Sequence, residues 1–242
     1  MKLSVIIPAF NEEAELPECL NLVHAAFRTI VAERGITWEL IVTDNNSTDR
    51  TSDIARIAGA QVIFEPRNQI ARARNAGAAV ATGDWFLFID ADSRLHVDSI
   101  RQMLDVIESG ACGAGGCLIR MDDAPFWGRC GVRLWNTLSI MMRCAAGSFV
   151  FCRSEAFHEI GGFDEEFYAA EELYFSKSLK QWCRRHQLRF VVLRHQPHAS
   201  SSRKFQIYSL TEICKLIVRV LFAYRRTVRN KQALDFFYDG RR

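Results

Sequence analysis

The sequence predicts an α/β fold built around a mainly parallel sheet. Strand-like and helix-like segments alternate through the first half of the chain, which is the pattern of consecutive βαβ units. The apolar run Trp85-Phe86-Leu87-Phe88-Ile89 lacks alternation, as expected of a strand buried on both faces. The 242 residues fit one large domain without repeats or a linker, so we expect both halves to share one sheet.

The expected elements follow in order along the first half. Strands are predicted over 3–7, 38–43, 61–64 and 85–89. Helices are predicted over 13–33, 52–58 and 71–81. The second helix is expected to be capped by Ser47, Thr48 or Asp49, and the third ends at Gly83. We interpret residues 1–95 as a nucleotide-binding half.

From Gly110 the pattern is less regular. The glycine-rich segment 110–116 is predicted to precede the elements of the second half, which are a short strand over 117–120, an apolar helix over 126–144, a strand over 148–152 and a last strand over 190–193. Gly161-Gly162-Phe163-Asp164 indicates a turn before a helix that begins at Glu171-Glu172. Residues 110–204 therefore form a second half, followed by a helix over 206–229.

The composition excludes several classes of protein. The net charge is +3, with 49% hydrophobic and 24% charged residues, which indicates neither disorder nor a nucleic-acid partner. Eight cysteines without a Cys-x-x-Cys pair are typical of reduced thiols. The first residues lack a signal-peptide core, so a cytoplasmic location is expected.

The segment 206–229 interleaves apolar residues with basic residues such as Lys215, Arg219 and Arg225. These charges interrupt the apolar run and argue against a spanning helix. An amphipathic helix of this kind can pack on the domain or lie on an anionic membrane surface at the inner face of the membrane. The sequence leaves both possibilities open.

Carboxylates follow two of the predicted strands. Asp90-Ala91-Asp92 comes directly after the buried run, at the strand end where open α/β sheets bind ligands. Of two acids spaced i and i+2, one can face a nucleotide while the other holds a divalent cation, although both could simply cap the next helix. Asp44 ends the second strand, should point into the same crevice as Glu12 and Asp90, and could accept a hydrogen bond from a uracil or thymine imide.

The turn Pro8-Ala9-Phe10-Asn11-Glu12 has no glycines to cradle a phosphate, which argues against dinucleotide and P-loop sites. It offers a flat apolar edge for a base and a carboxylate for a ribose or base donor, or it is a plain strand-to-helix connection. On the third helix, Arg72 or Arg74 could touch a phosphate or orient Asp90 through an ion pair.

Taken together, these segments resemble glycosyltransferase family 2. The resemblance is carried in order by Pro8 to Glu12, Asp44-Asn45-Asn46-Ser47-Thr48-Asp49, Ala73-Arg74-Asn75-Ala76-Gly77, Gly83-Asp84 and Asp90-Ala91-Asp92. It implies a GT-A type three-layer α/β/α sandwich with a mainly parallel central sheet, the nucleotide-diphospho-sugar transferase fold. Residues 1–242 would then be a single glycosyltransferase domain, with 110–204 as its acceptor-binding half.

The resemblance also implies roles for individual residues. The residues expected to bind the nucleotide are Pro8, Phe10, Glu12, Asp44, Arg74, Asn75, Asp90 and Arg203. Asp92 of the Asp-x-Asp motif is expected to ligate Mn²⁺ or Mg²⁺, with Asp90 and His198 as further candidate ligands. The family's Glu-Asp pair appears here as Glu171-Glu172, of which Glu172 is our first choice for the general base and Glu171 the second.

The resulting hypothesis is an inverting, metal-dependent, single-addition glycosyltransferase. The donor would be a nucleotide-sugar, with a UDP-sugar favoured, and the acceptor a sugar, lipid-linked or other hydroxyl, in cell-surface glycan or glycolipid synthesis. One alternative is a noncatalytic nucleotide-sugar binding protein on the same fold. A nucleotidyltransferase would need a glycine-rich basic loop after the first strand, which the sequence lacks.

Overall fold

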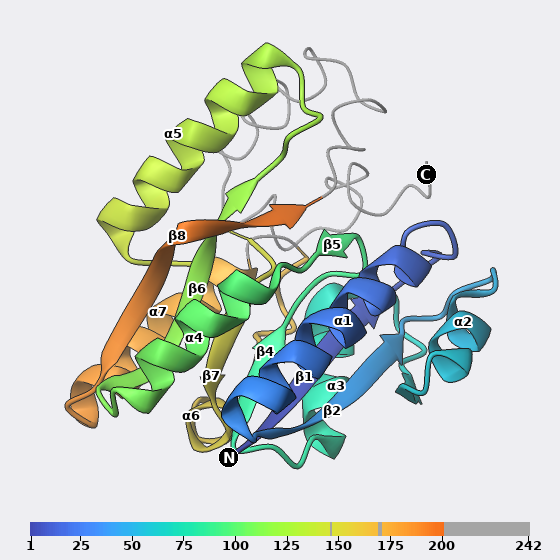
Figure 1. Cartoon of the computed structure of the whole chain (residues 1–242), viewed down its shortest axis with the longest axis horizontal. Helices are drawn as coiled ribbons and strands as arrows, with labels where there is room; N and C mark the ends of the chain where they lie inside the picture. Colours follow the sequence, from blue (N-terminus) through green and yellow to red (C-terminus); the bar gives the residue numbers. More distant parts are fainter. Residues whose placement is uncertain (146, 169–170, 201–242) are drawn as a thin grey trace.

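The computed structural model describes residues 1–145, 147–168 and 171–200, which form an α/β fold around one sheet (Figure 1). The strands are β1 Lys2–Ala9, β2 Thr37–Asp44, β3 Gln61–Phe64, β4 Trp85–Phe88, β5 Ser93–Arg94, β6 Cys112–Arg120, β7 Val150–Arg153 and β8 Arg189–Ser200. The helices are α1 Leu16–Arg34, α2 Thr51–Ile57, α3 Ile70–Val80, α4 Val97–Glu108, α5 Phe126–Met142, α6 Ser154–Ile160 and α7 Glu171–Arg185. None of these helices is long and apolar enough to cross a bilayer.

The sheet is mixed but mainly parallel, with the order β3-β2-β1-β4-β7-β6-β8-β5. The first four strands in the chain pair in parallel, as βαβ units require. β7 lies antiparallel between β4 and β6, and β5 lies antiparallel to β8 at one edge. Strands from both halves of the chain therefore share one sheet, as predicted.

Helices cover both faces of the sheet and give it three layers. One apolar cluster joins α1 and α4 to one face, and a second joins α3, α6 and α7 to the other. β4 contributes to both, because Leu87 belongs to the first cluster while Phe86 and Phe88 belong to the second. Burial on both sides explains why the sequence of this strand does not alternate.

The second half contains a helix that was not predicted, α6, and two of its strands are longer than the sequence prediction. The glycine-rich segment was expected to precede a strand at 117–120, but β6 already begins at Cys112 and includes it. The strand contains glycine for a steric reason, because a Cβ atom at Gly115 would lie 2.4 Å from both Phe151 Cζ and the Val191 carbonyl oxygen. The last strand was predicted to stop at residue 193, whereas β8 continues to Ser200 because its end pairs with β5 and β6.

Candidate functional site

Loops that carry the candidate residues leave the sheet at one edge. Parallel pairing places Ala9 beside Asp44 and Ile6 beside Phe88, so the loops after β1, β2 and β4 emerge side by side. Pro8 and Asp44 are buried, while Phe10 and Glu12 are half-buried. The structure thus places these predicted nucleotide-binding residues on neighbouring strand ends.

The first two loops bind each other. Ser47 Oγ accepts a hydrogen bond from the Asn11 N–H at 2.9 Å, and Asn11 Oδ1 accepts one from the Thr48 N–H at 2.8 Å. Asn11 has a left-handed φ of 51°, which asparagine tolerates better than most residues. The N-cap residue of α2 is Arg50, so the expectation that Ser47 or Thr48 caps this helix is wrong; Asp49, the third candidate, precedes Arg50 and accepts the N–H of Thr51 at 3.0 Å.

Arg74 connects the two halves of the site. Its Nη2 donates to Asp90 Oδ1 at 2.9 Å, and its Nη1 donates to Glu171 Oε1 at 2.7 Å. The side chain is 3% exposed, and although burial lowers the pKa of Arg74, Asp90 and Glu171 outweigh it and raise that pKa, so the guanidinium stays charged. Of the two roles open for Arg72 and Arg74, orientation of Asp90 falls to Arg74, whereas Arg72 pairs with Glu65 and Glu165.

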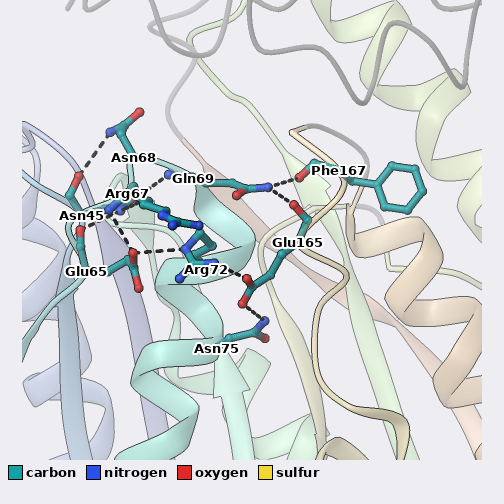
Figure 2. Close-up of polar contacts among 9 residues, drawn as sticks. All are labelled: Asn45, Glu65, Arg67, Asn68, Gln69, Arg72, Asn75, Glu165 and Phe167. Carbon is teal, nitrogen blue, oxygen red and sulfur yellow. Dashed lines mark hydrogen bonds and ion pairs between the residues drawn. The ribbon is translucent and has the colours of Figure 1, made fainter.

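The start of α3 also grips the loop that leads to Glu171 (Figure 2). Gln69 Nε2 donates to the backbone oxygens of Glu165 and Phe167 at 2.5 and 2.9 Å. Asn75 donates to the Phe163 carbonyl at 2.8 Å and accepts the Phe163 N–H at 2.9 Å. We call Gln69, Arg72, Arg74 and Asn75 the α3 bracket, because together they bind Phe163, Glu165, Phe167 and Glu171.

The contacts of Asn75 are structural ones, so its predicted role in nucleotide binding stays a prediction. Gln69 was missed by sequence reasoning, because its partners lie almost a hundred residues further along the chain and no local pattern announces them. A cavity of about 540 Å³ opens beside the bracket. It is lined by Arg67, Asn68, Gln69, Arg72, Asp164, Glu165, Glu166 and Tyr168.

The two candidate bases have different surroundings. Glu171 is buried and one of its oxygens binds Arg74, whereas Glu172 is half-buried at the start of α7. Desolvation of the Glu172 carboxylate by the surrounding protein, together with repulsion from the neighbouring Glu171 carboxylate, raises the pKa of Glu172 to about 8. The charge of Arg74 acts in the opposite direction. Glu172 is thus the acid whose proton affinity is tuned toward neutral pH.

His198 lies next to the Asp-x-Asp motif because β8 pairs with β5, which begins one residue after Asp92. Its Nε2 lies 2.9 Å from Ser93 Oγ, and its buried Nδ1 has no hydrogen-bond partner. Burial lowers the pKa of His198 to about 4, which keeps the imidazole neutral, the form that binds metals. Within the described part of the chain, however, no three His, Cys, Asp or Glu side chains are grouped as a metal site.

Two of the predicted features lie outside the described residues. These are Arg203, expected near the diphosphate, and the helix over 206–229 with its proposed membrane contact. Among the described residues, Asp92 is half-buried, and the Asp90 side chain is 35% exposed despite its bond to Arg74. Both carboxylates therefore remain within reach of a ligand.

Comparison with known proteins adds a family match. The family model described as Glycosyl transferase family 2 matches residues 4–161. An uncharacterized glycosyltransferase of Mycobacterium tuberculosis is 34% identical over 109 residues, which is 45% of this chain and 45% of the relative. A PGL/p-HBAD biosynthesis glycosyltransferase of Mycobacterium bovis is 36% identical over 99 residues, or 38% of this chain and 36% of the relative. The matches thus span less than half the length of these curated relatives.

Solved structures share the fold at low identity. TarS of S. aureus (residues 1–349) has a TM-score of 0.63 and 19% identity, covering 100% of this chain and 73% of that chain. Glucosyl-3-phosphoglycerate synthase from Mycobacterium tuberculosis, in complex with Mn²⁺ and UDP-glucose, has a TM-score of 0.63 and 19% identity, covering 95% of this chain and 80% of that one. These structures establish the GT-A fold.

Proposed function

Because this chain belongs to glycosyltransferase family 2, we propose that it transfers a sugar from a nucleotide-diphosphate donor to a hydroxyl acceptor, with inversion at the anomeric carbon. The observation that carries the proposal is the Arg74 bridge. It ties Asp90, on the strand-end side, to Glu171, next to the candidate base. The candidate base Glu172, which follows Glu171, is thereby held close to the strand end that carries Asp90. A single displacement requires this closeness, because the acceptor hydroxyl must attack the donor sugar directly.

The donor nucleoside is assigned to the loops after β1 and β2. Pro8 and Phe10 supply an apolar edge for the base, while Glu12 and Asp44 accept hydrogen bonds from the ribose and the base. Arg74 and Asn75 act indirectly in this proposal, through Asp90 and through the Phe163 backbone. A UDP-sugar is favoured because solved neighbours were crystallised with UDP-GlcNAc and UDP-glucose, although another neighbour holds GDP-mannose.

A divalent cation, Mn²⁺ or Mg²⁺, fits the residues beside Asp92. The half-buried Asp92 carboxylate is an oxygen donor of the kind that Mn²⁺ and Mg²⁺ prefer, and Asp90 retains an oxygen that is not bonded to Arg74. The unpartnered Nδ1 of the neutral His198 is a further candidate donor, for Mn²⁺ rather than Mg²⁺. Mg²⁺ sites of this type use one or two carboxylates and complete the coordination with substrate phosphates. When bound, the cation would neutralise the leaving diphosphate.

Glu172 is assigned as the general base. Its carboxylate takes the proton from the acceptor hydroxyl as the oxygen attacks the anomeric carbon, and the bond to the diphosphate breaks on the opposite side. Glu171 is less suited to this step because Arg74 holds one of its oxygens in a buried ion pair. A single addition to a sugar, lipid-linked or other hydroxyl acceptor completes the proposal, and we place the reaction in cell-surface glycan or glycolipid synthesis.

The test is nucleotide release from UDP-, GDP- and dTDP-sugars by the purified chain with Mn²⁺. We expect slow release from one donor class, a loss of about 10²- to 10⁴-fold in Glu172→Gln, and unchanged nucleotide binding by that variant. Glu155→Gln is the matched control, because this carboxylate is exposed on α6. Nucleotide binding without release from any donor would instead support the noncatalytic alternative, and unchanged turnover in Glu172→Gln would remove the base assignment.

A further inference from the structure

The outward face of α5 carries an apolar stripe. Phe126, Leu134 and Met141 are 73%, 63% and 74% exposed, and Leu138 and Cys130 are exposed between them. These positions follow one another at intervals of three or four residues, so they lie along one face of the helix. Exposed large apolar side chains in such an array mark an interaction surface rather than chance exposure.

The stripe faces away from the sheet, because the opposite face of α5 is attached to the rest of the protein. Asn136 Nδ2 donates to the Ile119 carbonyl at 2.8 Å, and its Oδ1 accepts the Ile119 N–H at 3.1 Å, which fastens the opposite face of α5 to β6. Gly128 and Ser139 are buried on that inner side. Lys180 of α7 donates to the Met142 carbonyl at the end of the helix. Figure 1 shows α5 standing apart from the helices that cover the sheet.

The positive charge of α5 indicates which kind of partner binds the apolar stripe. Residues 126–143 include three exposed arginines, Arg129, Arg133 and Arg143, and no acidic residue. A second copy that paired α5 with α5 would bring like charges together. The segment 206–229, with five basic residues and one acidic residue, is disfavoured for the same reason. An anionic surface complements both the apolar stripe and the arginines beside it.

We propose that α5 lies flat in the headgroup region of an anionic lipid bilayer. The apolar stripe enters the acyl boundary, and Arg129 and Arg133 contact lipid phosphates at its side. With 17 residues α5 is shorter than the roughly 20 apolar residues needed to span a bilayer, so the contact is peripheral. This surface is separate from the candidate site and goes beyond the proposed reaction.

The test is cosedimentation of the full chain with vesicles of phosphatidylglycerol and phosphatidylcholine, compared with phosphatidylcholine alone. We expect binding to the anionic vesicles and a loss of about tenfold or more in Leu134→Asp, because a charge then replaces an inserted apolar side chain. Ile57→Asp is the matched control, since Ile57 is 81% exposed on α2, and it should bind as the wild type does. Arg129→Gln with Arg133→Gln should weaken binding to the anionic vesicles alone.

Other results would overturn the proposal. These are no binding by the wild type, equal binding by Leu134→Asp and wild type, and a wild-type dimer in light scattering that Leu134→Asp dissociates, which would assign the stripe to a second copy. Nucleotide release without vesicles separates this proposal from the proposed function. All four substitutions lie outside the candidate site and should leave that release unchanged.

Discussion

Glu171 and Glu172 are adjacent in the sequence, yet they differ in what surrounds them. Arg74 neutralises Glu171, whereas Glu172 has a raised pKa and no comparable ion pair in the described structure. The sequence could only rank these residues by resemblance, because nothing near them in the chain shows that Arg74 reaches one of them. The partner lies almost a hundred residues away.

The raised pKa predicts an acidic limb in the pH profile. A general base acts only when deprotonated, so kcat/KM should fall as the pH drops through the pKa of Glu172, which is about 8 rather than the ordinary 4.5. Initial rates of nucleotide release between pH 5 and pH 9, at saturating Mn²⁺, measure this limb. A limb near the ordinary carboxylate value would contradict the assigned environment of Glu172.

Removal of Arg74 should destabilise the protein strongly. Arg74→Met leaves Asp90, Glu171 and Glu172 near one another without their shared cation, and breaking a buried ion pair in this way costs about 3–5 kcal/mol. Urea unfolding measures the loss.

A double-mutant cycle with Glu171→Gln separates the pair from general disruption. The second substitution should recover part of the loss, since it removes one of the stranded charges. Strictly additive losses would show that the Arg74–Glu171 pair contributes nothing of its own.

At the scale of elements, the first half was predicted well because its signals are local. The strand predicted over 38–43 is β2 Thr37–Asp44, and the helix predicted over 71–81 is α3 Ile70–Val80. Both reflect periodic apolar residues and turn residues within the segment itself. The start of β6 and the end of β8 were missed because their strand character depends on partners: Gly115 fits beside Phe151, and residues 199–200 pair with β5.

Two glycine substitutions test this account of β6. Gly115→Ala should destabilise the fold by about 1–3 kcal/mol or more, because the new methyl group meets Phe151 and the Val191 carbonyl. Gly131→Ala in α5 is the matched control: nothing lies within 4 Å of its Cβ position, and alanine favours the helix by about 1 kcal/mol. The midpoint temperature of thermal unfolding should therefore fall in Gly115→Ala and rise in Gly131→Ala. Equal shifts would show that β6 does not need its glycine.

At the scale of the whole molecule, one end of the sheet carries the candidate site and the other end carries contacts that stabilise the fold. The carboxyl ends of β1, β2 and β4 carry the candidate site, while the amino ends of β1 and β2 are joined by Glu39. This side chain accepts hydrogen bonds from Lys2 Nζ at 2.7 Å and from Ser4 Oγ at 2.5 Å. Glu39 could not be recognised from the sequence, since its partners come from a neighbouring strand and from the loop before β4.

Because of Glu39, the free energy of unfolding should decrease as the pH is lowered in the acid range. Burial acts to raise the pKa of Glu39, but hydrogen bonds from Lys2, Ser4 and Thr82 outweigh it and lower that pKa to about 2. The stabilisation is therefore present above the ordinary value of 4.5 and is lost as the pH falls toward 2. Glu39→Gln should lower the unfolding free energy at pH 7 by about 2 kcal/mol and flatten its acid dependence.

Urea unfolding at pH 7 and pH 3 measures both effects, with Glu155→Gln as an exposed carboxylate control. Nucleotide release at pH 7 should not change in Glu39→Gln, because Glu39 lies at the opposite end of the strands from the site. An acid dependence equal to that of the wild type would contradict the role of the Lys2 and Ser4 contacts.

The position of β4 has a consequence for synthesis on the ribosome. One edge of β4 pairs with β1, but the other waits for β7, whose residues emerge some sixty positions later. Until then the nascent chain exposes an unpaired edge flanked by Trp85, Phe86 and Phe88, all buried in the finished sheet. We therefore expect residues 1–95 alone to aggregate rather than to fold, so that the first half of the chain folds only together with the second half.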